Sequence, residues 1–90
     1  MSQAIVDPAE VRRFATNLKR FIADLRSAVS GVHGQLLALG ESWRDQEHDH
    51  FRQEFEATTQ VLERFLEVAE DHIPFLLRKA ERIEDYLTQR

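Results

Sequence analysis

The stretch Leu39-Gly40-Glu41-Ser42-Trp43-Arg44-Asp45 lies at the middle of the 90-residue chain and contains its only tryptophan. Long segments with helical spacing of apolar residues flank it on both sides. The chain has only three glycines and two prolines, so turns must be few. The sequence therefore predicts an all-α protein, an antiparallel two-helix hairpin that bends at Trp43 and forms one domain over residues 1–90.

The first helix is predicted over about residues 8–39. Asp7 suits the N-cap, Pro8 suits the first helical position, and Glu10 stands where a capping box has an acidic residue. Gly31 and Gly34 lie inside this helix and indicate either local weakness near its end or a smooth patch that another backbone approaches. Apolar residues recur at steps of three and four, at Val11, Phe14, Leu18, Phe21, Leu25, Ala28 and Val32, and Ala15, Ile22, Val29, Leu36 and Leu37 widen this stripe.

The turn is predicted at about residues 40–43 and the second helix at about 44–88. Gly40 fits the C′ position after the first helix, and Ser42 fits an N-cap for the second, with Asp45 three positions later. Pro74 lies inside the second helix, where proline removes one backbone hydrogen bond and crowds the preceding turn. Because the apolar stripe resumes in phase, we expect a kink near Pro74; the alternative is a break with Asp71 capping a final helix.

The apolar stripes are wider than the narrow seam that two packed helices bury. A lone hairpin would leave a long apolar strip in water, which soluble monomers rarely tolerate, and burial of one Leu or Phe side chain contributes roughly 1.5–3 kcal/mol. We therefore expect two hairpins to form a four-helix bundle. The alternative is a three-helix monomer in which the chain after Pro74 folds back. The predicted core and dimer residues are Val11, Phe14, Leu18, Phe21, Leu25, Phe55, Leu62, Phe65 and Leu66.

Charge is divided unevenly along the chain. Residues 1–40 contain five basic and three acidic residues, whereas residues 41–90 contain seven basic and thirteen acidic residues. This favours antiparallel pairing of the two halves and argues against a nucleic-acid partner, which needs a concentrated basic surface. No apolar run is long enough for a membrane span. The chain has no cysteine, and its first residues do not resemble a cleavable signal peptide.

The densest polar chemistry is Asp45-Gln46-Glu47-His48-Asp49-His50. Glu47 and His50 form one Glu-x-x-His motif, half of the ligand set that helical di-metal sites use. No second motif falls near the bend, so we expect a solvated first turn whose acidic residues complement the helix N-terminus. His33 could meet the His48 region across the bend in a pH-responsive contact, but an exposed histidine without such a contact is the favoured interpretation. We predict no catalytic, cofactor-binding or metal site; a metal-binding bundle is the least favoured alternative.

Trp43 has two interpretations. Its indole either covers the end of the bundle as a packing residue, or it is exposed at the turn as an anchor for a partner. The residues predicted to form this turn and partner site are Gly40, Ser42, Trp43 and Asp45.

These features together resemble the WXG-type, or ESAT-like, hairpin proteins of type VII secretion. The shared features are the helix start at Val6-Asp7-Pro8, the apolar register, and the central Trp in a short bend, flanked by Leu39 and Phe51. Two positions depart from the family pattern. Asp45 replaces the glycine expected two residues after Trp43, and the export signal Tyr-x-x-x-Asp/Glu is represented by Tyr86 followed by Arg90.

The resemblance implies a non-enzymatic association module, either a type VII secretion substrate or a chaperone-like partner. It implies a homodimer or heterodimer with a similar hairpin, with a larger effector or a secretion component as a further partner. Such a protein is cytoplasmic before export and is secreted without a cleavable signal peptide. The alternative is a cytoplasmic helical adaptor or toxin-associated module that is not secreted.

Overall fold

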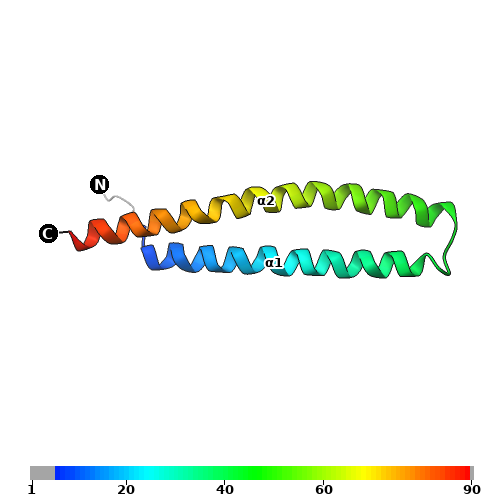
Figure 1. The fold of residues 1–90 in the computed structure, drawn as a ribbon, viewed down its shortest axis with the longest axis horizontal. Coiled ribbons are helices and arrows are strands. Elements are labelled where there is room, and N and C mark those ends of the chain that lie inside the picture. Colours follow the sequence, from blue (N-terminus) through cyan, green and yellow to red (C-terminus); the bar gives the residue numbers. More distant parts are fainter. Residues whose placement is uncertain (1–5, 90) are drawn as a thin grey trace.

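The computed structural model describes residues 6–89, which form two helices in antiparallel contact (Figure 1). Helix α1 spans Pro8–Leu39 and helix α2 spans Gln46–Thr88. The molecule is a rod with extents of 70 × 22 × 19 Å, with the bend at one end and the two ends of the chain at the other. The predicted all-α hairpin is thus confirmed.

The start of α1 is the one predicted. The Asp7 carboxylate accepts a hydrogen bond of 2.9 Å from the Ala9 N–H, and Pro8 opens the helix, where its missing N–H costs nothing. At the other end, Gly40 follows Leu39 with φ −63° and ψ −14°. This is a right-handed conformation that any residue adopts, so the reason for a glycine at this position is not backbone freedom.

The start of α2 differs from the prediction. Its N-cap is Asp45 rather than Ser42, and the helix begins at Gln46. The Ser42 hydroxyl instead donates to the Leu39 carbonyl oxygen, because the chain continues in a tight turn after α1. The Trp43 N–H donates to the same carbonyl at 2.9 Å. The bend therefore runs to Asp45, which caps α2.

Pro74 lies inside an uninterrupted α2. The predicted alternatives of a break at Asp71 and of a third helix folding back are therefore wrong for this chain. Pro74 is exposed, so its ring does not disturb the contact with α1. A kink near Pro74 is not shown and stays a prediction.

The core is a single narrow layer of side chains between α1 and α2. The side chains that are fully buried are few, and in α1 they follow a seven-residue spacing. Ala15, Ile22 and Leu36 belong to the column that we expected only to widen the apolar stripe. The buried apolar residues are Ala15, Ile22, Leu36, Leu66 and Ala80.

Candidate functional site

The bend is closed by a buried histidine. His48 is 5% exposed, and its Nε2 lies 2.9 Å from the Leu36 carbonyl oxygen, to which it donates as an N–H. The Trp43 indole meets the His48 ring edge to face, with the ring centroids 5.1 Å apart and an interplanar angle of 69°. The sequence predicted a solvated first turn at His48. This prediction was wrong, because the imidazole packs between the end of α1 and the Trp43 indole.

Gly40 makes room for this imidazole. A Cβ atom built on Gly40 would lie 2.7 Å from His48 Cε1 and 3.2 Å from the Leu37 carbonyl oxygen. The first distance is shorter than any ordinary contact, so a side chain at residue 40 would displace the His48 ring. Gly40, Trp43 and His48 are therefore one packed unit.

Asp45 caps the start of α2, at the position two residues after Trp43 where a glycine was expected. Its carboxylate accepts a hydrogen bond of 3.1 Å from the His48 N–H, so it satisfies an N–H of the first turn of α2. This bond is the main reason why the pKa of Asp45 is lowered, with a smaller contribution from the Trp43 side chain. The same residue thus caps α2 and holds the backbone of the histidine that closes the bend.

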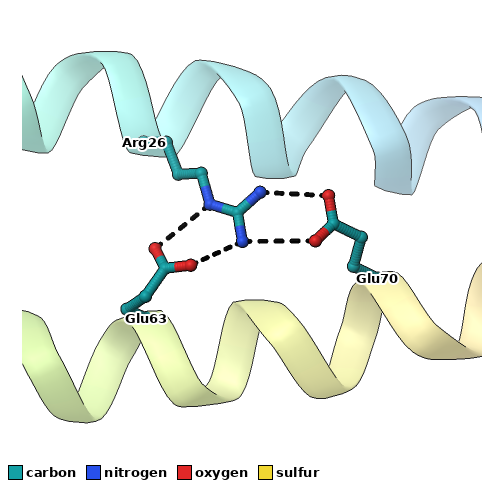
Figure 2. A network of polar contacts seen from close by, with 3 residues as sticks. All are labelled: Arg26, Glu63 and Glu70. Carbon is teal, nitrogen blue, oxygen red and sulfur yellow. Dashed lines mark hydrogen bonds and ion pairs between the residues drawn. The ribbon is translucent and has the colours of Figure 1, made fainter.

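Ion pairs join the two helices along one side of the hairpin. The Arg26 guanidinium binds two carboxylates of α2, with Nη2 2.6 Å from Glu63 Oε2 and Nη1 3.0 Å from Glu70 Oε2 (Figure 2). Arg12 makes a two-atom contact with Glu84 nearer the open end, with distances of 2.6 and 3.0 Å. These pairs link residues far apart in sequence and match the predicted attraction between the two halves.

His33 completes this charged side near the bend. Its Nε2 lies 2.8 Å from Glu56 Oε2, and Arg52 contacts the other oxygen of the same carboxylate at 3.1 Å. The His33 ring also stacks on Phe55, with centroids 5.8 Å apart and the planes within 3°. His33 therefore pairs with Glu56. The contact with the His48 region, considered from the sequence, does not form.

Three of the paired carboxylates have lowered pKa values. His33, followed by Arg52, lowers the pKa of Glu56, and Arg26 lowers that of Glu63. Arg12 lowers the pKa of Glu84 in the same way. Because these groups are still partly exposed to water, each pair contributes little by itself. Together they specify how far α2 is displaced along α1.

The opposite side of the hairpin is apolar. At about 100° per residue, Phe21 lies roughly 140° around α1 from Arg26, and Phe65 lies roughly 160° around α2 from Glu63. Because antiparallel helices turn corresponding flanks to the same side, the phenylalanines gather on the side away from the ion pairs. Phe14, Phe21 and Phe65 are 56%, 52% and 60% exposed. Large aromatic side chains with half their surface in water mark an association surface.

The predicted core residues divide into three groups. Leu66 is fully buried between the two helices. Val11, Leu18, Leu25, Phe55 and Leu62 are half-buried at the margin of the seam, and Phe14, Phe21 and Phe65 lie outside it.

Of the predicted turn residues, Gly40 and Trp43 are half-buried at the bend, whereas Ser42 and Asp45 are exposed. His48 is the residue of this site that sequence reasoning missed. Gly40 gave no sequence signal for it, because a glycine is also expected at the C′ position after a helix.

The other polar residues considered from the sequence, Glu47 and His50, do not form a shared site. His50 is exposed and lies 3.6 Å from Glu54, and Glu47 is also exposed. Among residues 6–89 there is no group of three or more His, Asp or Glu side chains that could hold a metal ion. Within the same residues neither helix is long and apolar enough to cross a membrane.

Comparison with known proteins adds a family match. A family model described as "Proteins of 100 residues with WXG" (WXG100) matches residues 3–86. A search of curated protein sequences finds no match.

Several solved structures share the fold. The secreted protein EsxB of Bacillus anthracis is 23% identical, with a TM-score of 0.79 and coverage of 96% of this chain and 98% of that one. A proline-to-alanine variant of EsxB superposes with a TM-score of 0.85 at 22% identity, covering 96% of this chain and all of that chain. At this level of identity the similarity establishes the hairpin fold alone.

Proposed function

This chain belongs to the WXG100 family, and from that membership we propose that it acts in type VII secretion as a non-enzymatic association protein, either a substrate or the chaperone-like partner of one. The observation that supports this role is the exposed row of phenylalanines opposite the ion pairs. EsxB, with which the chain shares its fold, is described as a secreted protein.

The proposed assembly is a dimer with a second, similar hairpin, either an identical chain or a related one. In a four-helix bundle, Phe14, Phe21 and Phe65 leave water together with the half-buried Leu18 and Leu25. Each such side chain contributes roughly 1.5–3 kcal/mol when it is fully buried, which is large for a hairpin whose own seam buries so little. Folding and association of this chain are therefore coupled.

The bend is the proposed contact for a further partner, such as a larger effector or a component of the secretion apparatus. Trp43 is half-buried against His48 and keeps one part of its indole at the surface. A tryptophan that its neighbours hold in one position loses little freedom on binding, as is typical of interface anchors. Gly40, Ser42 and Asp45 complete this surface.

The proposed export signal begins near the end of α2. Tyr86, the tyrosine of the expected signal, is 75% exposed near the end of α2. Arg90, which stands where the family pattern has an acidic residue, lies outside the described residues. We propose that the chain is made in the cytoplasm and exported together with its partner, since its own signal is incomplete.

Sedimentation equilibrium tests the dimer. The wild-type chain should sediment as assemblies of at least two copies, or do so only with a related hairpin present. The double variant Phe14→Ser/Phe21→Ser should lower the average mass of these assemblies, while Val6→Ser, which is 45% exposed but precedes α1, should not. A wild-type monomer that keeps full helicity in dilute solution, with or without related hairpins, would refute the assembly.

An export assay separates the secreted protein from a cytoplasmic adaptor. In the native cell, the chain should appear in the medium only when the secretion apparatus is intact and its partner is co-expressed. An Arg90→Glu variant, which restores the acidic position, should be exported with less dependence on the partner. Retention of both forms in the cytoplasm would favour the adaptor.

A further inference from the structure

A second apolar row runs along the outer side of α2. Val61, Val68 and Phe75 are 67%, 55% and 62% exposed. They are spaced by seven residues and therefore lie nearly above one another on the helix. At about 100° per residue, Val68 lies roughly 160° around α2 from the buried Leu66. The row thus points away from α1. Phe65 of the phenylalanine side adjoins it, four residues after Val61 and three before Val68.

Charged residues flank this row in a regular pattern. Arg64, Asp71 and Arg78 each follow a member of the row by three residues, so all three lie on the same flank. The Arg78 guanidinium lies 4.7 Å from the centre of the Phe75 ring. None of the ion pairs found among residues 6–89 involves Arg64 or Asp71, although both are exposed and opposite in charge.

We propose that this outer row is a self-association surface, on which the α2 helices of two chains pair antiparallel about a two-fold axis at Val68. Val61 and Phe75 are each seven residues from Val68, so each would meet the other residue in the second chain. Val68 would meet its own copy on the axis. A two-fold interface requires such a self-complementary pattern, and a smaller residue opposite a larger one fills the seam evenly.

The flanking charges obey the same symmetry. Arg64 lies four residues before Val68 and Asp71 three residues after it, on one flank. When two such helices pair antiparallel, equal flanks face one another, so Arg64 of each chain would lie opposite Asp71 of the other. The symmetry produces this pair twice. Two groups that make no ion pair within the hairpin would thus each gain one in the assembly.

Two other occupants fit this surface less well. An anionic lipid surface would meet Asp71 in the middle of the flank, on a chain whose formal net charge is −4. An acidic helix of another protein would meet the same carboxylate. Only a partner that alternates in sign as this helix does satisfies both Arg64 and Asp71, and a second copy has that pattern.

The surface goes beyond the proposed function, and its test does not require the four-helix dimer. Phe65, which borders both surfaces, is left unchanged in the variants below. A chain that uses both surfaces has two different two-fold interfaces, which build either a closed tetramer or an open row of dimers. A chain that uses the outer row alone forms a dimer of another kind. Variants of one surface should leave the other unaffected.

Cysteine crosslinking tests the axis, because the native chain has no cysteine. Under mild oxidation Val68→Cys should form a covalent dimer, since the two sulfur atoms meet on the axis. Val61→Cys alone should not, whereas Val61→Cys/Phe75→Cys should. Ser27→Cys, on an exposed position of α1, is the matched control. Equal crosslinking of Val68→Cys and Ser27→Cys would overturn the proposal.

A charge swap tests the flank. Arg64→Asp and Asp71→Arg should each weaken crosslinking through residue 68 by about tenfold, and the double variant Arg64→Asp/Asp71→Arg should restore it. Arg13→Asp makes the same change of charge on α1 and should have no effect. A double variant as weak as the single ones would overturn the pairing, as would an Arg64→Asp variant that loses binding to anionic vesicles while crosslinking is unchanged.

The phenylalanine side is separated within the same experiment. Phe14→Ser/Phe21→Ser in the Val68→Cys background should leave the crosslink intact if the two surfaces are independent. Loss of the crosslink with retained helicity would show that the outer row does not associate by itself, and would overturn the independence claimed for it. Neither result depends on whether the proposed four-helix dimer forms.

Discussion

The imidazole of His48 occupies the space that a side chain on Gly40 would need. Gly40 follows the last residue of α1, and His48 lies in the first turn of α2. A Cβ on Gly40 would fall 2.7 Å from His48 Cε1. The same imidazole donates to the Leu36 carbonyl oxygen and carries the Trp43 indole on its face. One contact between a glycine and a histidine therefore determines how the hairpin closes.

Replacement of the glycines separates this contact from helix propensity. Gly40→Ala should destabilise the protein by about 1–3 kcal/mol, because the new methyl group displaces the His48 ring. Gly31→Ala and Gly34→Ala should each stabilise it by about 0.5–1 kcal/mol, since their Cβ positions are open within 4 Å and alanine favours the helix. Urea unfolding at one protein concentration measures all three. A neutral Gly40→Ala would mean that the ring has room to move.

Removal of the histidine should loosen the bend. We expect His48→Ala to cost roughly 2 kcal/mol or more, because it leaves a cavity and removes the donor to the Leu36 carbonyl oxygen. The emission of Trp43, the only tryptophan, should shift to longer wavelength as its contact with the ring is lost. His50→Ala, whose side chain is 74% exposed, is the control and should change neither property. An unchanged spectrum in His48→Ala would contradict the packing.

The N-cap of α2 predicts an order of stability at residue 45. Asp45 accepts from the His48 N–H, so Asp45→Asn should be tolerated best, Asp45→Gly should lose some stability, and Asp45→Ala should lose most. Asp45→Gly also restores the family's Trp-x-Gly pattern at Trp43. Thermal unfolding followed by circular dichroism ranks the three. A glycine variant that exceeds the wild type would show that the carboxylate cap is not what holds this bend.

Acid should weaken the hairpin. The pKa values of Glu56, Glu63 and Glu84 lie below the ordinary value of 4.5, so the stability from these groups is complete above that pH. It is lost as the pH falls through their lowered values. The melting temperature should therefore drop below pH 4.5.

Two glutamine variants provide the control for this pH dependence. Glu63→Gln removes a carboxylate that Arg26 binds, so the variant should melt lower at neutral pH and lose less on acidification. Glu67→Gln removes a carboxylate that makes no ion pair among the described residues and should follow the wild-type profile. Parallel profiles for both variants would exclude the ion pairs as the source.

Much of the hairpin follows from patterns that act locally. Asp7 with Pro8 starts α1 as their chemistry requires, and α1 ends at Leu39, just before Gly40, as predicted. The width of the apolar stripe also indicated that a lone hairpin would leave apolar side chains in water. Which column of the stripe faces α2 was beyond such reasoning, because Ala15 and Ile22 compete with Phe14 and Phe21 for the same seam. In the folded hairpin, Ala15 and Ile22 are buried against α2, and the larger Phe14 and Phe21 are exposed.

The bend contains features that sequence patterns do not predict. Ser42 and Asp45 are both good N-caps, and the choice between them depends on how many residues the turn after α1 consumes. His48 looks polar in a row of acidic residues, and only the three-dimensional return of the chain buries it. The pairing of His33 with Glu56 similarly depends on the displacement of α2 along α1, which no local pattern encodes.

The rod's layout also determines how it responds to mechanical force. The start of α1 and the end of α2 lie at the same end of the rod, opposite the bend (Figure 1). Opposing forces on the start of α1 and the end of α2 would load Arg12 with Glu84 first, then Arg26 with its two carboxylates, and Glu56 last. The helices would unzip one contact at a time rather than shear apart all at once.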